Sequence, residues 1–385
     1  MLYKLRLFTL LALATVMAVG LTSTSLAAQP ETQAAQDAID YIRTLQNPDG
    51  GFPATAGEES SPGSTVDAVF ALAAAGIDPA TVQKDGGSPS DYLRSQAAAY
   101  SEDPGAAAKL FLGVVALGED PRDFGGVDLL AVLDGSFEAG SGRFGIDLFD
   151  HGLFMLARAS AALGVPEAAV SYLTSKQLAD GGWEFDEGWG ADTNTTALAL
   201  QALIAAGEGP SSAGVQGGLA YLAAAQNDDG GFPYSPESEY GTDSDANSTA
   251  VVIQALAAAG EDVGAGGPWD KGEGRTPLAA LLSFQNLETG AFTFGGEDSA
   301  FATYQAVPGL LLAPLPVATT TLEERVMPAP AATSATPGVA VVAVPAAGQG
   351  PGEGRQGAAL PLAAALAAGG LLAAGSGLLL RLRRG

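Results

Sequence analysis

A short motif that recurs along the chain constrains its fold more than any other feature. Each copy has a glutamine, two variable residues, Asp-Gly-Gly and then an aromatic residue. Three copies with this spacing start at Gln46, Gln177 and Gln226. A fourth copy, from Gln285 to Phe292, is one residue longer and lacks the aspartate. A motif that recurs with fixed internal spacing indicates repeated structural units that share one core with their neighbours.

Each repeat contains two segments with different hydrophobic patterns. The segment before the glutamine has apolar residues at helical spacing, such as Ala35, Ile39 and Ile42, with charged residues between them. This pattern predicts an amphipathic helix, which ends at the glycine pair because glycine readily takes the left-handed conformation of a helix exit. The segment after the aromatic residue is apolar on nearly all sides, which predicts a helix buried on most faces. The best-matched apolar segments are 65–76, 196–207 and 249–260.

Weaker copies fill the rest of the repeat region. They are predicted at 90–118 and 128–164, and the last apolar segment, 300–312, is expected to be interrupted by Pro308. The pattern therefore predicts an all-α domain over residues 29–313, with about six helix pairs in two concentric rings. Closing the pairs into an α/α toroid would hide the two apolar ends that an open array exposes.

The repeats resemble those of the prenyltransferase/squalene-cyclase repeat family, which includes terpenoid cyclases and protein prenyltransferases. The Gln-x-x-Asp-Gly-Gly-Trp/Phe units are similar to the glutamine–tryptophan motifs of triterpene cyclases. This resemblance covers residues 33–312 and implies the α/α toroid fold. It does not fix the activity, because the same toroid serves enzymes, cobalamin carriers and complement-type domains.

The residues that carry the family's known reactions differ here. Cyclases of the family have Asp-x-Asp-Asp-Thr-Ala, in which the middle aspartate is the proton donor. The two similar segments, 192–197 and 245–250, have Asn194 and Asn247 at that position, and an amide cannot donate the proton. With no cysteine and one histidine, the chain also lacks the zinc ligands of protein prenyltransferases and the thioester of complement-type domains.

Both ends of the chain carry predicted targeting signals. Residues 1–28 have a basic start, an apolar stretch and small residues near a cleavage position, which predicts a secretory signal peptide. Residues 314–356 are rich in proline and alanine and predict a stalk. Residues 357–380 have no charged side chain and predict a transmembrane helix, followed by a basic cytoplasmic tail at 381–385. These segments predict an exported, single-pass membrane protein with an extracellular toroid.

The composition limits the partners that this domain can bind. The formal net charge of −26 argues against nucleic acid, which basic surfaces bind. The expected partners are an extracellular ligand or protein and, through the C-terminal helix, the membrane. No cofactor is firmly predicted, although a Ca²⁺ ion would suit an acidic extracellular domain.

Polar residues just before two apolar segments form the candidate ligand site. Asp192, Asn194, Asp245, Asn247 and Ser248 either cap the helices that follow them or form a polar rim where helix N-termini meet and bind a ligand.

Asp243, Asp245 and Asn247 have the spacing of the first three ligands of an EF-hand loop, but the glycine and the final glutamate of that loop are missing. An irregular Ca²⁺ site at these three residues is therefore the metal hypothesis.

The aromatic residues of the repeat motif are expected to pack in the core. Trp189, Tyr234 and Tyr240 lie outside the repeated positions and are therefore candidates for ligand contact. The lone histidine, His151, is either a general base or an incidental core residue.

Three functions remain open from the sequence. The first is a surface-displayed toroid that binds a ligand or partner without catalysis. The second is an isoprenoid-related enzyme, a cyclase or transferase, with a divergent acid. The third is a glycan-acting enzyme, which would need two opposed carboxylates.

Overall fold

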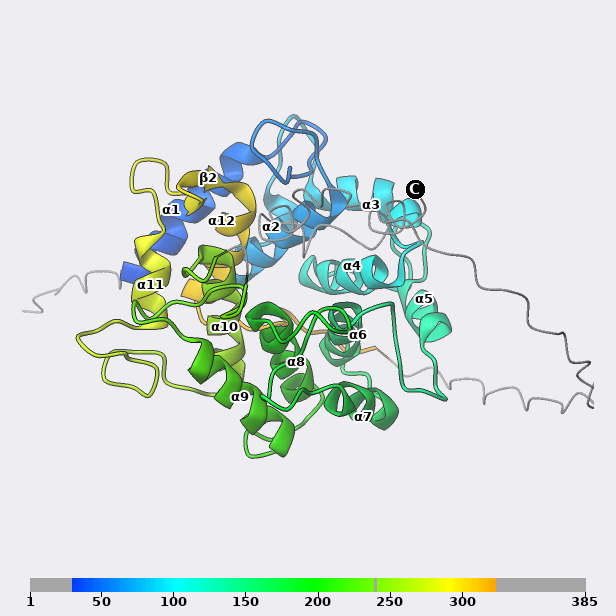
Figure 1. Ribbon diagram of the computed structural model, residues 1–385. Coiled ribbons are helices and arrows are strands. Elements are labelled where there is room, and N and C mark those ends of the chain that lie inside the picture. The colour runs from blue at the N-terminus through cyan, green and yellow to red at the C-terminus, as the bar shows by residue number, and fades with distance from the viewer. Residues whose placement is uncertain (1–29, 239–240, 323–385) are drawn as a thin grey trace, which may run out of the picture.

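The computed structural model describes residues 30–238 and 241–322 (Figure 1). Within these residues the chain forms twelve α-helices, one 3₁₀ turn, η1 (Pro79–Thr81), and one small β-hairpin. The helices alternate between an outer and an inner ring, as the repeat pattern predicts. The outer helices are α1 (Pro30–Leu45), α3 (Pro89–Tyr100), α5 (Leu129–Ser136), α7 (Glu167–Ser175), α9 (Ala213–Ala225) and α11 (Pro277–Ser283). The inner helices are α2 (Pro62–Ala74), α4 (Pro104–Ala116), α6 (Leu148–Ser160), α8 (Thr193–Ala205), α10 (Ala246–Ala258) and α12 (Ala300–Leu310).

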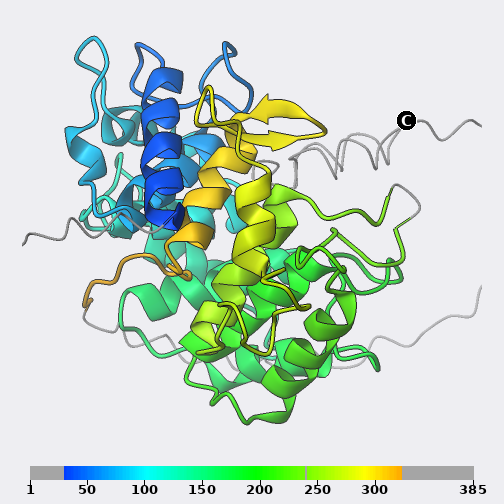
Figure 2. The same cartoon turned by 90° about the vertical axis from the view of Figure 1, so that its left-hand side faces the viewer.

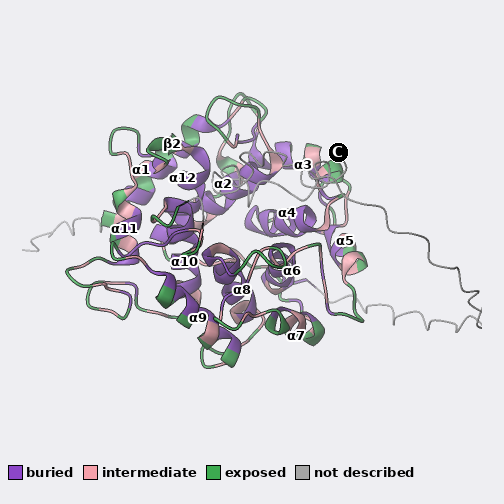
Figure 3. Ribbon diagram, in the orientation of Figure 1, coloured by how far each residue is buried: buried purple, intermediate pink, exposed green. Residues whose placement is uncertain are grey.

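The six inner helices close into a complete ring. Each packs against the next one in the chain, and α12 packs against both α10 and α2 (Figure 1). These helices are buried on nearly all sides, whereas the outer helices show exposed residues on their outward faces (Figure 3). In α4, every residue after the initial proline is buried. The prediction of an α/α toroid with two concentric rings is therefore confirmed.

The repeated glutamines join neighbouring outer helices. Nε2 of Gln226 donates hydrogen bonds to the carbonyl oxygens of Gly230 and Trp269, both at 2.9 Å. The first carbonyl belongs to its own loop, and the second lies ahead of the next outer helix, α11. Gln46 and Gln177 make the same pair of contacts with their own loop and the chain near the next outer helix. The motif therefore links each repeat to the following one.

The fourth motif closes the ring. Gln285 follows α11, and its Nε2 donates at 2.8 Å to the carbonyl oxygen of Ala34 in α1. The hydroxyl of Tyr304 in α12 donates at 3.0 Å to the carbonyl oxygen of Pro53. These contacts join segments 251 residues apart in the chain, so the last repeat uses the first repeat as its neighbour.

The repeat aromatics lie in the core at matching positions. Phe52, Trp183, Phe232 and Phe292 are fully buried. The backbone N–H of each donates to a threonine hydroxyl in the inner helix of the same repeat, at 2.9–3.0 Å. The expectation that these aromatics pack in the core is confirmed.

Two local features of the last repeat differ from the sequence pattern. A hairpin of β1 (Phe292–Phe294) and β2 (Glu297–Ser299) precedes α12 and turns at two glycines with positive φ (Figure 2). Pro308 lies inside α12 and does not interrupt it. The helix continues because the backbone N–H of Leu311 still donates to the carbonyl oxygen of Val307, at 3.1 Å, and it ends at Leu310.

The chain after α12 packs across the inner ring, and we call residues 312–322 the strap. The backbone N–H of Leu315 donates to Oε1 of Gln201 in α8 at 2.8 Å. The N–H groups of Thr320 and Leu322 donate to the carbonyl oxygens of Ser160 and Ala161, at 2.7 and 3.0 Å. Residues 314–322, which the composition assigns to the stalk, therefore pack against the C-terminal ends of inner helices.

The predicted targeting segments lie mostly outside the described residues. This applies to the signal peptide at 1–28, to the stalk beyond residue 322, to the transmembrane helix at 357–380 and to the tail at 381–385. Among the helices that the structure describes, none combines the length and the apolar character needed to cross a bilayer.

Candidate functional site

A cavity lies on the inside of the inner ring, and its lining follows one stripe of each helix. The helix residues that line it stand mainly at the second, sixth and ninth positions. In α8 these residues are Asn194, Leu198 and Gln201. Positions spaced by four and three residues lie on one face of a helix, so the same stripe of each helix faces inward. The volume open to the centre of a water-sized molecule is about 60 Å³.

The two ends of the cavity are different. At the N-terminal end of the inner helices lie Asn194, Asp245 and Asn247, together with Tyr234 from the loop between α9 and α10. At the other end the strap contributes Leu315, which the Gln201 hydrogen bond holds in place. The strap therefore forms part of the cavity wall at the C-terminal end.

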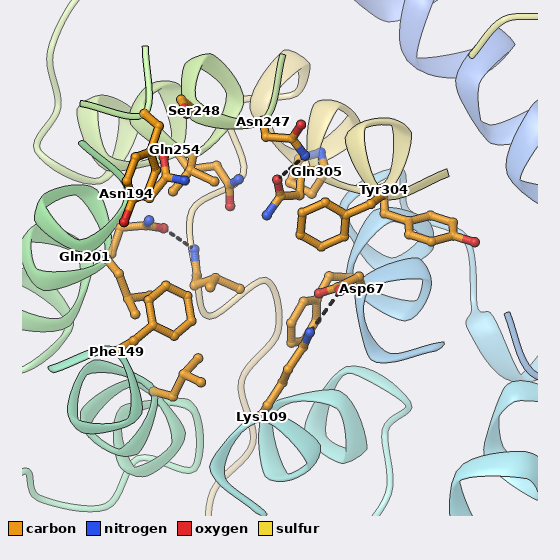
Figure 4. Close-up of a pocket in the computed structure, with 18 of the residues that line it drawn as sticks. Asp67, Lys109, Phe149, Asn194, Gln201, Asn247, Ser248, Gln254, Tyr304 and Gln305 are labelled. Carbon is orange, nitrogen blue, oxygen red and sulfur yellow. Dashed lines mark hydrogen bonds and ion pairs between the residues drawn. The ribbon is translucent and has the colours of Figure 1, made fainter. Parts of the chain in front are cut away.

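One side of the cavity contains a buried ion pair. Nζ of Lys109 in α4 lies 2.9 Å from Oδ2 of Asp67 in α2, and the two side chains are 3% and 4% exposed (Figure 4). Burial raises the pKa of the Asp67 carboxyl and lowers that of the Lys109 ammonium, while the charge of each partner opposes that effect. Because the two charges lie in contact, the pair adds little net charge to the cavity.

The inner helices α8, α10 and α12 contribute amide side chains to the cavity. Nδ2 of Asn247 in α10 donates to Oε1 of Gln305 in α12 at 2.8 Å (Figure 4). Gln201 accepts from the strap. Gln254, at the ninth position of α10, is 6% exposed, and no hydrogen bond joins its amide to another residue that the structure describes. Apolar and aromatic residues complete the wall. They are Phe70, Phe149, Leu153, Leu198, Val251, Phe301, Tyr304 and Pro308.

The structure brings together five of the sequence-predicted site residues, one of which is Ser248. Asn194, Tyr234, Asp245 and Asn247 all line the N-terminal end of the cavity. Trp189 is 54% exposed, lies beside Phe185 at 6.1 Å between ring centroids, and does not line the cavity.

Tyr240, the remaining aromatic candidate, lies outside the described residues.

Asp192 and Asp245 cap the inner helices α8 and α10. Oδ1 of Asp192 accepts from the backbone N–H of Thr195 at 2.7 Å, and Oδ1 of Asp245 accepts from that of Ser248 at 2.8 Å. Oδ2 of Asp245 also accepts from the Ser248 hydroxyl at 2.9 Å. These are the contacts of N-capping residues, so capping accounts for both aspartates.

Asp192 is the more deeply buried of the two caps. It is 3% exposed, and its Oδ2 has no hydrogen-bond partner among the described residues. Burial raises the pKa of Asp192 to about 7, against the lowering effect of the backbone N–H groups of α8. This carboxyl therefore titrates near neutral pH.

The three residues of the calcium hypothesis are not arranged as a ligand set. Asp243 is exposed, both oxygens of Asp245 accept hydrogen bonds within its cap, and Asn247 contacts Gln305. Within residues 30–238 and 241–322, no group of three or more histidine, aspartate or glutamate side chains could hold a metal ion.

His151 has fixed partners in the core. Its Nδ1 accepts from the backbone N–H of Phe144 at 3.2 Å, and its Nε2 lies 3.0 Å from the carbonyl oxygen of Ala169. A neutral ring with the proton on Nε2 satisfies both contacts. Burial lowers the pKa of His151 to about 4. The ring is fully buried and joins α6 to the chain around it.

Most of the cavity lining carries no signal in the sequence pattern. Asp67, Lys109, Gln254 and Gln305 stand at the sixth or ninth positions of inner helices. Counting four and seven residues onward from Asn247 would have reached Val251 and Gln254. That signal became usable only once the facing stripe of each helix was known.

Comparisons with solved structures support the fold. The apo form of type II terpene cyclase MstE from Scytonema superimposes with a TM-score of 0.52 at 14% identity, covering 74% of this chain and 98% of the cyclase. A variant of MstE in complex with its substrate, geranylgeranyl dihydroxybenzoate, matches with a TM-score of 0.50 at 13% identity, covering 74% and 97%. A protein named UGL with the saccharide dGlcA-Glc-Rha-Glc matches with a TM-score of 0.52 at 13% identity, covering 72% and 95%. No curated protein matches the chain.

The sequence itself shows the family. The profile of the prenyltransferase alpha-alpha toroid domain matches residues 8–98 and 150–322, which is more than half of the chain. The matched ranges include the four glutamine motifs, four of the six inner helices and most of α6. This protein therefore belongs to the prenyltransferase alpha-alpha toroid domain family.

Proposed function

We propose that this toroid binds a small molecule in its central cavity and releases it unchanged. The observation that carries this proposal is the pair Asn194 and Asn247 at the N-terminal end of the cavity. These are the positions at which the related cyclases carry an acid, and an amide has no proton to donate to an alkene. A cavity with apolar walls and a few polar groups suits binding.

An isoprenoid cyclase with a divergent acid is the first rival function. Asp192 is the candidate acid, because its pKa of about 7 leaves it partly protonated at neutral pH. Such a carboxyl is too weak an acid to protonate an alkene, and its Oδ1 is engaged in the cap of α8.

A glycan-cleaving enzyme is the second rival. It needs a carboxylic acid and a carboxylate facing each other across the substrate. The carboxylates of the described cavity are Asp67 and Asp245. The first is paired with Lys109, and the second accepts hydrogen bonds with both oxygens. This arrangement favours binding over hydrolysis.

Product analysis tests the proposal. The purified full-length chain is incubated with squalene, oxidosqualene or geranylgeranyl dihydroxybenzoate, and the extract is examined by mass spectrometry. We expect no cyclic product. A cyclic product that disappears in Asp192→Ala but persists in Asp243→Ala would replace the proposal by the cyclase function. Asp243 is the control because its side chain is exposed.

We further propose that the toroid is displayed outside the cell and held by the segment 357–380. The sequence pattern at the two ends supports this placement. Protease added to intact cells should degrade the toroid and leave a small membrane-bound C-terminal fragment. A toroid that is protected until the cells are lysed would contradict the proposal.

A further inference from the structure

We propose that the cavity takes a neutral, hydroxyl-rich ligand, such as a sugar unit of an extracellular glycan, and that Gln254 is its anchoring residue. This inference rests on the proposed binding function and names the chemical class of the ligand. It rests on the unpaired amides, the charge and the aromatic surface of the cavity.

Gln254 is a buried polar side chain without a protein partner. It is 94% buried inside the ring, and its amide makes no hydrogen bond with the residues that the structure describes. Figure 4 places it among the side chains around the cavity, with no dashed line to it. Buried polar groups are nearly always hydrogen-bonded. The amide atoms of Gln254 are not among the fully enclosed polar atoms without a partner, so they face the cavity space, where water or a ligand completes their hydrogen bonds.

Gln305 and Asn247 add further polar groups to the same cavity. Their one mutual hydrogen bond uses Nδ2 of Asn247 and Oε1 of Gln305. Within the described residues this leaves the Nε2 donor of Gln305 and the Oδ1 acceptor of Asn247 without a partner. Together with Gln254, which lies about two helical turns (roughly 10 Å) further along α10, they present donors and acceptors along one wall of the same cavity. A hydroxyl group both donates and accepts, so a ligand with several hydroxyls along its length can pair with amides at both levels of the cavity.

A hydrocarbon ligand would not suit these amides. An isoprenoid chain makes no hydrogen bond, so filling the cavity with one would keep the amides from water and leave them unpaired. Each unpaired buried group weakens binding by roughly a factor of ten. Sites built to hydrogen-bond a hydroxyl reject analogues that lack it by large factors for the same reason.

The charges and the aromatic residues narrow the ligand class further. Asp67 and Lys109 neutralise each other, while Asp245 lines the N-terminal end of the cavity. This carboxylate disfavours an anionic ligand such as a uronate. Phe149, Phe301 and Tyr304 supply apolar surface, which suits the C–H faces of a sugar ring.

Binding measurements on the purified full-length chain test this inference. Calorimetry is carried out with neutral sugars (glucose, galactose, mannose and N-acetylglucosamine, as monosaccharides and short oligomers), with glucuronate and with geranylgeraniol. The variants are Gln254→Leu and, as a matched control, Gln36→Leu on the exposed face of α1. We expect a neutral sugar to bind, glucuronate and geranylgeraniol to bind at least tenfold more weakly, and Gln254→Leu alone to weaken sugar binding tenfold or more.

The thermal melts of the free variants separate a ligand contact from a structural role. Because the Gln254 amide has no protein partner, Gln254→Leu should melt at or above the wild-type temperature without ligand. A clear fall in melting temperature would show that the side chain is structural and overturn its assigned role. Absence of sugar binding, or sugar binding that Gln254→Leu leaves unchanged, would overturn the inference.

The outcomes also separate this inference from the proposed function. Geranylgeraniol bound unchanged in the cavity, and more tightly in Gln254→Leu, would overturn the sugar inference while keeping the binding function. Chemical conversion of any of these compounds would overturn the binding function itself.

Discussion

Glutamine has different roles in two regions of this toroid. One region is the set of contacts between neighbouring outer helices, which we call the seam, and the other is the central cavity. In the seam, Gln46, Gln177, Gln226 and Gln285 each donate two hydrogen bonds to backbone carbonyls, one of them in the next repeat. In the cavity, Gln254 makes none with the described residues, and Gln305 accepts only one. The fold satisfies the seam amides and also Gln201 in the cavity, which accepts from Leu315 and donates to the carbonyl oxygen of Ala197. Gln254 and the free groups of Gln305 and Asn247 instead depend on whatever fills the cavity.

This difference separates stability from binding. Removing a hydrogen-bonded buried amide leaves its partner groups buried without a hydrogen bond. The protein then loses stability, because each of these groups has given up its contact with water and gained nothing in return. Removing an unsatisfied one costs little and can stabilise the free protein. Mutations in the two regions should therefore have opposite effects, and the cavity ion pair should behave like the seam.

The largest effect is expected at the ion pair. Lys109→Met leaves Asp67 as an unpaired buried carboxylate, and breaking such a pair costs about 3–5 kcal/mol of unfolding free energy. Urea denaturation measures the loss, and the double variant Asp67→Leu/Lys109→Met should recover most of it. A single variant as stable as wild type would show that the pair is not a closed structural contact.

A smaller loss of unfolding free energy is expected for a mutation in the seam. Gln226→Leu removes two hydrogen bonds to the carbonyl oxygens of Gly230 and Trp269, at a cost of about 2–3 kcal/mol. Its counterpart in the cavity, Gln254→Leu, should cost nothing by the same denaturation assay. Equal losses in both variants would remove the distinction between the two regions.

The pH dependence of stability should report on Asp192. Its folded-state pKa is raised from 3.8 to about 7, so the folded protein binds more protons than the unfolded chain between these values. Its contribution is therefore fully present below about pH 4 and is lost as the pH rises to about 7. Asp192→Asn keeps the capping oxygen and removes this loss. We expect it to stabilise the protein at pH 8 by at least about 1 kcal/mol and to have little effect at pH 4.

Two comparisons control this prediction. Asp147 and Asp150, with pKa values raised to about 6 and about 7, mainly by burial, should give both proteins a common decline in stability as the pH rises. Asp243→Asn, at an exposed position, should not change the pH dependence. Identical pH profiles for wild type and Asp192→Asn would contradict the prediction.

The smallest change in unfolding free energy is expected for Trp189, the exposed aromatic residue in the loop between α7 and α8. Trp189→Ala should change the unfolding free energy by less than about 0.5 kcal/mol, because half of the side chain is exposed. If Trp189 contacts ligand, as the sequence predicts, this variant weakens binding without changing stability. If the cavity alone binds, neither quantity changes. A large loss of stability would show that Trp189 supports the loop between α7 and α8.

The repeat made the fold predictable from local rules. Glycine pairs mark helix ends, and the apolar period distinguishes outer from inner helices, so the two rings follow from nearest-neighbour information. Where the pattern is weaker, local rules failed: Pro308 is accommodated inside α12, and residues 314–322 pack on the ring although their composition indicates a stalk. Both segments are stabilised by contacts with chain that is distant in sequence, which no window of residues reveals.

The candidate site was predicted only at its N-terminal end. Asn194 and Asn247 stood out because they replace an acid in a family motif, and Tyr234 because it lies outside the repeat. No sequence feature singled out Lys109 or Gln254, because a polar residue in an apolar helix can face a cavity, a partner or a neighbouring helix.

The sequence by itself determined the toroid, its family and the loss of the cyclase acid, because each depends on residues close together in a repeated unit. The tertiary structure decided which stripe of each inner helix faces the centre. It also decided that Asp67 finds Lys109 and that Gln254 finds no protein partner. These outcomes depend on the ring closing, which brings six helices from the whole length of the chain around one space.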